Sequence, residues 1–232
     1  MPLQLTGLNN PTVAMAADAT FKAAHVNSRP MESLNWQCIS TVTGNQTVTV
    51  AFVNTTGAGT IYSLRNNGPN LIAVRRVQVG FRLTTAFTAA QMMDYALVIG
   101  RNHVTPFVAG GTILNTLTSA NSGKLDSRRN SSPPISIITA TTAGLTALTA
   151  GNVIFDPNFI GYVNWWNGAA GAGIPPSTVL FESLPGEFPL LLLSQESINV
   201  SNVTLMGAAG VGIATITVEF AEVPAMAMSV FV

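Results

Sequence analysis

The chain has 232 residues, of which 47% are hydrophobic and only 9% are charged, and its formal net charge is zero. The high hydrophobic content excludes a disordered chain, although an ordinary soluble domain carries roughly 25% charged residues. A neutral chain with only two lysines excludes a general attraction to nucleic acid or to an anionic membrane, and a weakly charged surface is typical of a subunit whose faces are covered by neighbours.

The N-terminal segment, residues 1–30, shows no alternation of apolar and polar side chains. It lacks the basic and apolar parts of a secretory signal, so we expect a chain that is not exported. Its composition of Ala, Thr, Asn and Met predicts an extended arm, ordered mainly by contacts outside its own domain, because such a segment buries too little surface to order itself. The apolar residues Met15, Phe21 and Val26 are the expected contacts with a neighbour, and residues 14–24 would also tolerate a helix.

Residues 31–232 are expected to form a single domain rich in strands. Residues 76–83 alternate between the two faces of a strand, and the apolar face predicts core residues at Val77, Val79, Phe81 and Leu83. Residues 215–220 repeat the alternation with Ile216, Val218 and Phe220. Further strands are predicted at residues 36–39, 47–52, 60–64, 95–101, 135–139, 178–182, 190–193 and 197–203. Many short strands separated by Gly, Pro and Asn turns predict an all-β fold, either an antiparallel β-sandwich or a barrel.

Other segments of the domain carry different signals. Residues 88–91, Thr-Ala-Ala-Gln, form a capping box that predicts one or two helical turns before Met92. Residues 120–134 and 162–176 are predicted to be long loops. Cys38 is the single cysteine, which excludes an internal disulfide, and its place in a predicted strand indicates a buried, inert thiol.

The sequence contains no recognisable catalytic, cofactor or metal motif. His25 and His103 stand alone, and one cysteine with two histidines cannot supply a structural zinc site. The glycine run at residues 207–212 precedes a predicted strand, so it indicates a hairpin loop and not a phosphate-binding loop. The longest dense apolar segment, residues 188–193, is far shorter than the ~20 residues that cross a bilayer. We therefore expect no enzyme, cofactor, metal or small-molecule substrate, and neither a membrane nor a nucleic-acid partner.

Two pairs of adjacent residues are the candidate interaction residues of the domain. Trp165 and Trp166 lie on an extended segment, where neighbouring side chains point to opposite faces, so one ring is expected outside the local core. Such a ring anchors a neighbouring subunit or stacks on a sugar. Arg75 and Arg76 either meet an acidic partner surface or form salt bridges along a strand. With the three apolar residues of the arm, these four complete the predicted assembly interface.

Short segments spread over most of the chain form one ordered pattern. They are Phe21-Lys22-Ala23, Ser28-Arg29-Pro30, Ile61-Tyr62-Ser63-Leu64-Arg65-Asn66, Leu71-Ile72-Ala73-Val74-Arg75-Arg76-Val77, Thr85-Ala86-Phe87-Thr88-Ala89-Ala90-Gln91, Gly186-Glu187-Phe188-Pro189-Leu190, Ile198-Asn199-Val200 and Val218-Glu219-Phe220-Ala221-Glu222. Taken in this order they resemble structural virion proteins of tailed bacteriophages, although such proteins often have Trp at the position of Phe220. These motifs are structural and supply no active-site residues.

The resemblance implies a jelly-roll-like β-sandwich with an N-terminal arm, carried on a phage particle. It implies a non-enzymatic cement or decoration protein that stabilises the head by bridging subunits of the major capsid protein. The expected partners are the major capsid protein and further copies of the chain, with a homotrimer favoured. The expected location is the virion, assembled in the cytoplasm of the bacterial host.

Three alternatives stay open at this point. A head fibre or a receptor- or glycan-binding protein could use the same sandwich, with Trp165 and Trp166 as its binding residues. A tail or neck component would have the same sequence features as a head protein. An enzyme, such as a depolymerase or lysin, would need a nucleophile, a base or a metal constellation, and the sequence offers none of these.

Overall fold

The structure is a computed structural model of the chain. It describes residues 4–7, 10–14, 34, 36–47, 50–114, 123–124, 135–167, 177–184, 187–205 and 210–223. The chain divides into two compact units, Met1–Ser33 and Leu34–Val232. In the described residues the secondary structure is entirely β. Met15, Phe21 and Val26 lie outside the described residues, as does the expected helix at residues 14–24 except for Ala14.

The first unit contains a short hairpin that the sequence analysis did not predict. Its strands are β1 (Gln4–Gly7) and β2 (Asn10–Ala14), which form a two-stranded antiparallel sheet. The ladder shifts register between Leu5 and Gly7. Strands of four and five residues are too short for a period of two to stand out, so the sequence pattern does not predict them.

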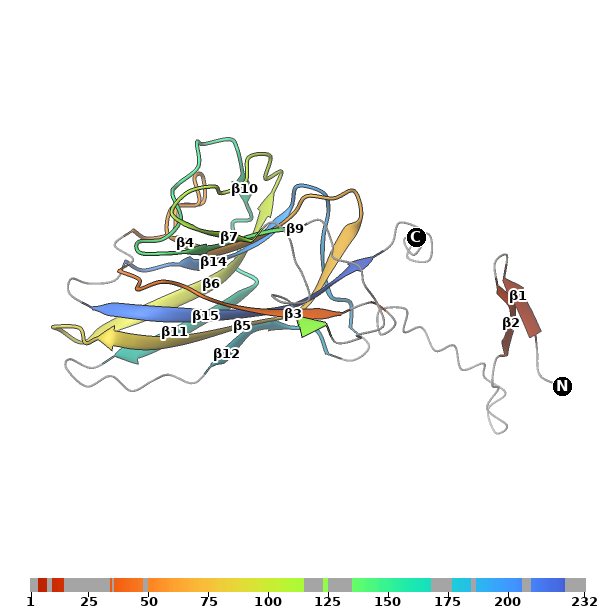
Figure 1. The fold of residues 1–232 in the computed structure, drawn as a ribbon, viewed down its shortest axis with the longest axis horizontal. Coiled ribbons are helices and arrows are strands. Elements are labelled where there is room, and N and C mark those ends of the chain that lie inside the picture. Colours follow the sequence, from red (N-terminus) through yellow and green to blue (C-terminus); the bar gives the residue numbers. More distant parts are fainter. Residues whose placement is uncertain are drawn as a thin grey trace. The chain divides into compact units, whose positions relative to one another are not determined.

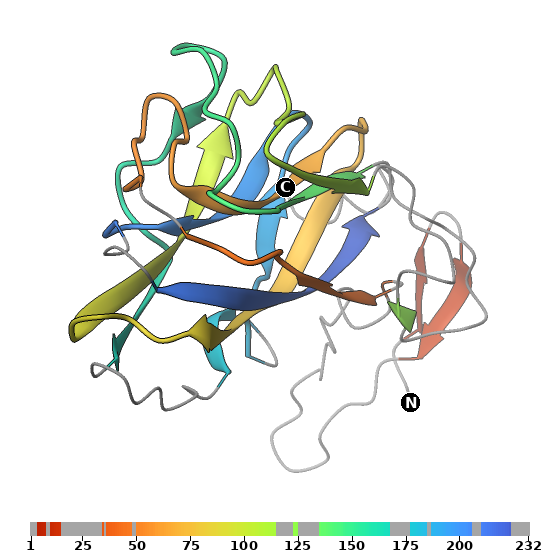
Figure 2. The ribbon, with the colours of Figure 1, turned by 60° about the vertical axis from the view of Figure 1, so that its left-hand side comes forward.

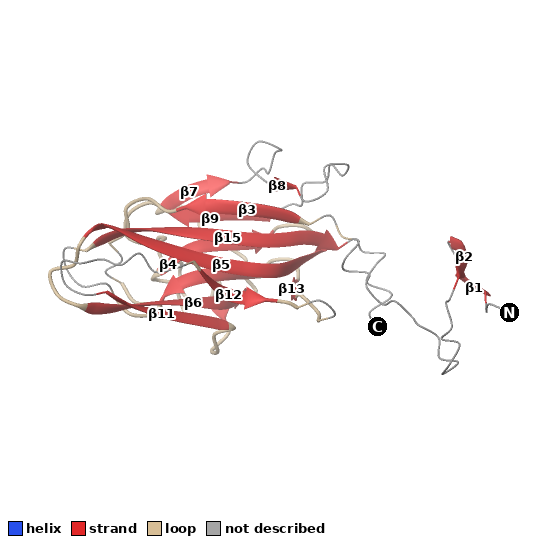
Figure 3. Ribbon diagram, turned by 90° about the horizontal axis from the view of Figure 1, so that it is seen from below, coloured by secondary structure: helices blue, strands red, loops and turns tan. Residues whose placement is uncertain are grey.

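The second unit contains two antiparallel sheets that pack against each other (Figures 1 and 3). The seven-stranded sheet has the order β10 (Ile154–Phe155), β6 (Gln91–Arg101), β14 (Ser197–Asn202), β4 (Thr60–Asn66), β9 (Ile135–Ala140) and β7 (Gly111–Leu114), with β11 (Gly161–Asn167) also paired to β6. The six-stranded sheet has the order β12 (Thr178–Glu182), β5 (Leu71–Thr85), β15 (Val211–Val223), β3 (Gln37–Val42) and β8 (Gly123–Lys124), with β13 (Leu190–Leu192) also paired to β5. The predicted all-β antiparallel sandwich is therefore confirmed, while the jelly-roll connectivity stays a prediction.

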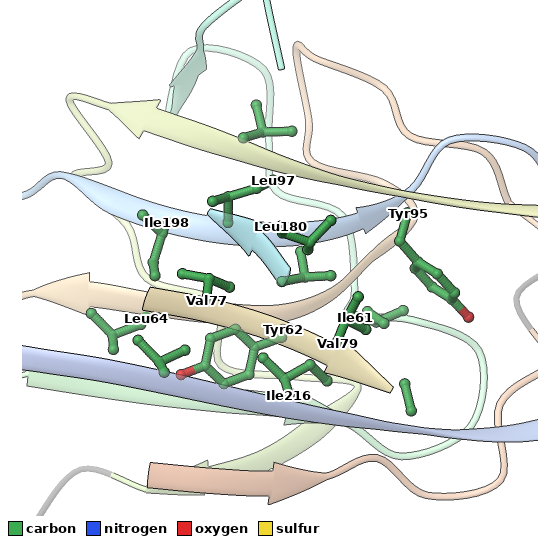
Figure 4. Close-up of a cluster of buried hydrophobic side chains, with 14 of the residues drawn as sticks. Ile61, Tyr62, Leu64, Val77, Val79, Tyr95, Leu97, Leu180, Ile198 and Ile216 are labelled. Atoms are coloured by element: carbon green, nitrogen blue, oxygen red, sulfur yellow. The ribbon is translucent and has the colours of Figure 1, made fainter. Parts of the chain in front are cut away.

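The core lies between the two sheets and contains the residues that the alternation predicted. Val77, Val79, Phe81, Ile216 and Val218 are each at most 2% exposed, whereas Leu83, near the end of β5, is only partly buried. Figure 4 shows such side chains from both sheets filling the same layer. These positions alternate with polar ones because only one face of β5 and β15 packs on the opposite sheet.

The glycine at position 212 allows an aromatic ring to approach the backbone of β15. A Cβ on Gly212 would lie 1.9 Å from Cζ of Phe81, closer than any real contact. Gly210 has the same relation to Phe87, whose Cδ1 would lie 1.7 Å from the added Cβ. The described part of the glycine run therefore serves the packing of two phenylalanine rings.

Loops cover the face of the seven-stranded sheet that points away from the six-stranded sheet (Figures 1 and 2). We call residues 50–59, 102–110 and 141–160, which include the two-residue strand β10, the loop layer. It contributes buried side chains of its own, including Phe107, Val153 and Phe155. A Cβ on Gly100 of β6 would lie 3.2 Å from Cγ2 of Val153, which shows how closely the layer packs on the sheet. As a result every residue of β9 and β14 is buried.

Two local predictions are wrong. The capping box at residues 88–91 does not start a helix, because Gln91 begins β6 and Met92 pairs with Trp166 of β11. Residues 47–52 form no regular strand where they are described, because Thr47 and Phe52 donate backbone hydrogen bonds to Thr142 and Asn202. In both cases tertiary contacts override a local preference.

Four strands of the second unit were not predicted as such, and one of them is β8, within the expected loop at residues 120–134. The expected loop at residues 162–176 is a strand over its first part, since β11 extends to Asn167. β7 has only four residues and β10 only two, and each was assigned to a connection between strands. Such short elements form because a neighbouring strand offers backbone hydrogen bonds, which leaves little trace in a local pattern.

Truncation of Phe81 tests the core. We expect Phe81→Ala to lower the free energy of unfolding by about 3–5 kcal/mol, because the ring packs between the sheets and against Gly212 and its removal leaves a cavity. Val42→Ala, at a side chain that is 58% exposed, is the control and should cost less than about 1 kcal/mol. Urea unfolding followed by tryptophan fluorescence measures both, and equal losses in the two variants would contradict this view of the core.

Candidate interaction site on strand β11

The two adjacent tryptophans of β11 point to opposite sides of the sheet, as predicted. Trp165 is 9% exposed and faces the core, whereas Trp166 is 69% exposed. The ring of Trp165 stacks on Phe81 with centroids 6.4 Å apart and meets the edge of Tyr95 at 5.7 Å. Trp165 therefore belongs to the sandwich core, and the ring that β11 presents to solvent is that of Trp166.

Trp166 is one of three outward side chains on β11. Tyr162 is 50% exposed, and the side chain of Asn164, halfway between the two rings, is also exposed. We call Tyr162, Asn164 and Trp166 the outer row of β11. Across the ladder these residues pair with Ala96, Asp94 and Met92 of β6. Since Met92 is 42% exposed, the apolar surface continues onto the neighbouring strand.

The ring of Tyr162 is held from two sides. Its face stacks on Phe159 with centroids 6.3 Å apart and planes within 7°. Its hydroxyl interacts with the buried carboxylate of Asp94, and partial burial together with this hydrogen bond raises the pKa of Tyr162. Thr204 donates a hydrogen bond to the same carboxylate. The outer row therefore rests on a fixed aromatic and polar support, which lowers the entropy lost when a partner binds.

The predicted arginine pair lies on the outer face of the six-stranded sheet and is salt-bridged within the chain. The β5–β15 ladder shifts register between Glu219 and Phe220, so Arg75 is the extra residue of a β-bulge. Arg75 Nη2 lies 2.6 Å from Glu219 Oε2, and its guanidinium lies 4.7 Å from the centroid of Trp36. Arg76 Nε lies 3.6 Å from Glu182 Oε1. The pair therefore already has carboxylate partners in the isolated chain.

A buried polar group beneath the loop layer was not predicted from the sequence. His103 Nδ1 lies 2.8 Å from Oγ of Ser197, and Asn199 donates a hydrogen bond of 2.9 Å to the same oxygen. All three residues are fully buried. A substrate cannot reach this His–Ser contact, so we assign it to structure. The available signal was the polar alternation at positions 197, 199 and 201, but nothing in it pointed to His103.

Burial lowers the pKa of His103 to about 4, and the nearby positive charge of Arg65 adds to this effect. The Arg65 Nε donates a hydrogen bond of 2.5 Å to the carbonyl of His103. The ring of His103 also packs edge-on against Phe107 at 5.3 Å. The folded state therefore favours the neutral form of His103.

Two other features are absent from the described residues. No three side chains of His, Cys, Asp and Glu there are arranged to hold a metal ion. The same residues contain no helix that is long and apolar enough to cross a membrane. Comparison with known proteins gives no match, either to a family model or to a curated sequence.

The His103 environment predicts how stability depends on pH. The pKa of His103 is lower in the folded state than its ordinary value of 6.5. Above pH 6.5 the ring is neutral in both states, so the stability contributed by the neutral ring is fully present there. That contribution, on the order of 3 kcal/mol, should be lost as the pH falls from 6.5 to 4. Urea unfolding at a series of pH values measures the loss.

His103→Gln is the control, because glutamine carries no titrating group. Acidic residues titrate in both proteins, so the difference between the two pH profiles reports on His103. We expect a flatter profile for the variant between pH 6.5 and 4. Two profiles of the same slope would show that His103 titrates normally in the folded state.

Proposed function

We propose that the protein is a non-enzymatic structural subunit of a bacteriophage virion, most specifically a cement or decoration protein that bridges major capsid subunits of the head. The observation that carries this proposal is the surface of the sandwich. Among the described residues three arginines are paired with carboxylates, while large apolar side chains remain exposed. Such a surface is suited to burial against neighbours.

Four ion pairs join arginines to carboxylates among the described residues. Besides the two arginines at the bulge of β5, Arg101 contacts Asp156 at 3.2 Å and Glu196 at 2.7 Å. The most exposed apolar side chains include Phe188 at 73%, Trp166 at 69% and Val108 at 65%. Interface cores are depleted of Lys, Glu and Asp and enriched in aromatic residues, which is the composition of this surface.

The phage and capsid assignment depends on the resemblance in the sequence, to which the β-sandwich adds agreement in fold class. A jelly-roll connection of the strands, a trimeric state and contact with the major capsid protein belong to the same proposal. Closed symmetry is the default for such modules, and a trimer fits the three-fold axes of a capsid. Residues 1–30 would act as a clamp that orders on a neighbouring subunit and adds buried area there.

A receptor- or glycan-binding protein is the second candidate. The outer row of β11 favours it, because two exposed aromatic rings flank an amide that can bind hydroxyl groups. The present surface also carries exposed apolar groups away from β11, such as Phe188 and Val108, which a sugar site does not need. We therefore place the assembly role first. The tail or neck location remains an alternative to the head.

Self-association tests the proposal. We expect the purified chain to form a closed oligomer at micromolar concentration, or to bind capsids assembled without it, because exposed apolar area favours both. Sedimentation velocity and electron microscopy of decorated particles are the measurements. A chain that stays monomeric and also fails to bind capsids would contradict the proposed function.

Removal of the arm tests the clamp. Deletion of residues 1–27 should leave the sandwich folded, because the core of the second unit lies between its own two sheets. The same deletion should weaken oligomer formation or capsid binding, because the clamp contacts are lost. Circular dichroism checks the fold and sedimentation checks the assembly. Unfolding of the truncated chain would place the arm in the core, and normal decoration would dismiss the clamp.

A further inference from the structure

Strand β11 lies at the margin of the seven-stranded sheet (Figures 1 and 3). Along one side it pairs with β6 without a bulge, from Gly161↔Leu97 to Asn167↔Gln91. No strand that the structure describes pairs with its other side. A strand edge of this kind presents N–H and C=O groups on which a further strand can be added.

The sequence of β11 lacks the usual protection of an edge strand. Natural proteins protect edges with lysine, proline, inward charges, bulges or very short strands. The seven residues of β11, Gly-Tyr-Val-Asn-Trp-Trp-Asn, contain no charge and no proline. Several other described margins are protected: β7 has four residues, β8 has two, and β12 has a bulge after Val179 and ends at Glu182. β3 is also uncharged and pairs with β8 only at Gln37 and Cys38, but it has six residues, so β11 is the longer of these two uncharged edges among the described strands.

We propose that a second copy of the chain adds its own β11 to this edge, antiparallel and across a two-fold axis at Asn164. The inference rests on the proposed function and names one of its subunit contacts. The outer row has an aromatic residue at each end and an amide in the middle, so it is symmetric about Asn164. In this register Tyr162 of each copy faces Trp166 of the other, and Val163 faces Trp165.

The two copies complement each other in chemistry as well as in symmetry. Aromatic cross-strand pairs stabilise antiparallel ladders. The two-fold axis forms the Tyr162–Trp166 pair twice, once on each side of Asn164. No residue of the outer row is charged, and the nearest carboxylate, that of Asp94, is buried and accepts a hydrogen bond from Thr204. The contact therefore brings no like charges together, which would otherwise oppose a symmetric pairing.

The available area predicts a weak contact. The exposed parts of Trp166, Tyr162 and Phe159 supply at most roughly 400 Å² of aromatic surface per copy, since a fully buried aromatic side chain contributes ~150–250 Å². A standard stable interface buries ~800 Å² per partner. The contact would therefore be weak for a free pair and effective within a shell, where many contacts act together. Trimers on three-fold axes meet their neighbours at two-fold axes, so the contact can link them.

A designed disulfide tests the register. Residues that face each other in an antiparallel pair have Cα atoms ~4.5–5.5 Å apart, which is within the range that a disulfide bridges. In a Cys38→Ser background, Asn164→Cys should give a covalent dimer under mild oxidation, seen on a non-reducing gel. Ser40→Cys in the same background is the matched control, because it places an exposed thiol on β3 of the other sheet, and it should stay monomeric. Circular dichroism verifies that both variants are folded.

Sedimentation equilibrium provides the second measurement. We expect Trp166→Ser to weaken self-association roughly tenfold or more, because a tryptophan buried at an interface is a typical hot spot. Val42→Ser, which changes a side chain that is 58% exposed on β3 of the other sheet, should leave the association unchanged. Loss of association in the Trp166 variant alone, together with the Asn164→Cys dimer, supports the proposal.

The outcomes separate this inference from the proposed function. If the natural chain assembles but folded Asn164→Cys forms no covalent dimer, the β11 contact is wrong and the assembly role stands. If the chain neither assembles nor binds capsids, the proposed function fails. If Asn164→Cys stays monomeric and a glycan array shows binding that Trp166→Ser abolishes, the outer row binds sugar and the β11 contact is overturned.

Discussion

The pairing of β5 with β15 is the contact on which the rest of the sandwich depends. The two strands run antiparallel from Val211↔Thr85 to Val223↔Leu71 and form the centre of the six-stranded sheet. Their inner faces supply the side chains on which the seven-stranded sheet packs. The bulge in this ladder also places Arg75 and Arg76 on the outer face, where each finds a carboxylate. The register of the β5–β15 ladder therefore determines both which side chains enter the core and where the two arginines lie on the surface.

The strands that could be predicted from the sequence are those with one buried and one exposed face. Alternation located β5 and β15 because the outer faces of both strands remain polar. β9 and β14 were also predicted as strands, although their burial on both faces removes any contrast between the faces. β11 was missed because its Trp-Trp pair and the following Gly and Ala residues resemble a loop. The capping box before β6 wrongly predicted a helix because it reflects only local sequence. The strand forms instead because β6 pairs with β11, which lies far away in the sequence.

In the candidate site, too, some features follow from local sequence and others depend on tertiary contacts. Strand geometry alone predicted that one of the two tryptophans lies outside the core. The choice of Trp166, and the support of Tyr162 by Phe159 and Asp94, required the register of β11 on β6. The contact of His103 with Ser197 joins residues 94 positions apart, so no local pattern could have found it. Contacts of this kind follow from the topology and are absent from any short segment.

The loop layer has a consequence for how the protein tolerates change. Connections between strands usually accept insertions and tags, because they carry few buried groups. Here Phe107 and Val153 lie in connections and are each 2% exposed. A peptide inserted between residues 102 and 110 or within residues 141–160 would displace core side chains. Display of foreign epitopes on this scaffold should therefore avoid the face where loops are most abundant, which is the opposite of ordinary practice with β-sandwiches.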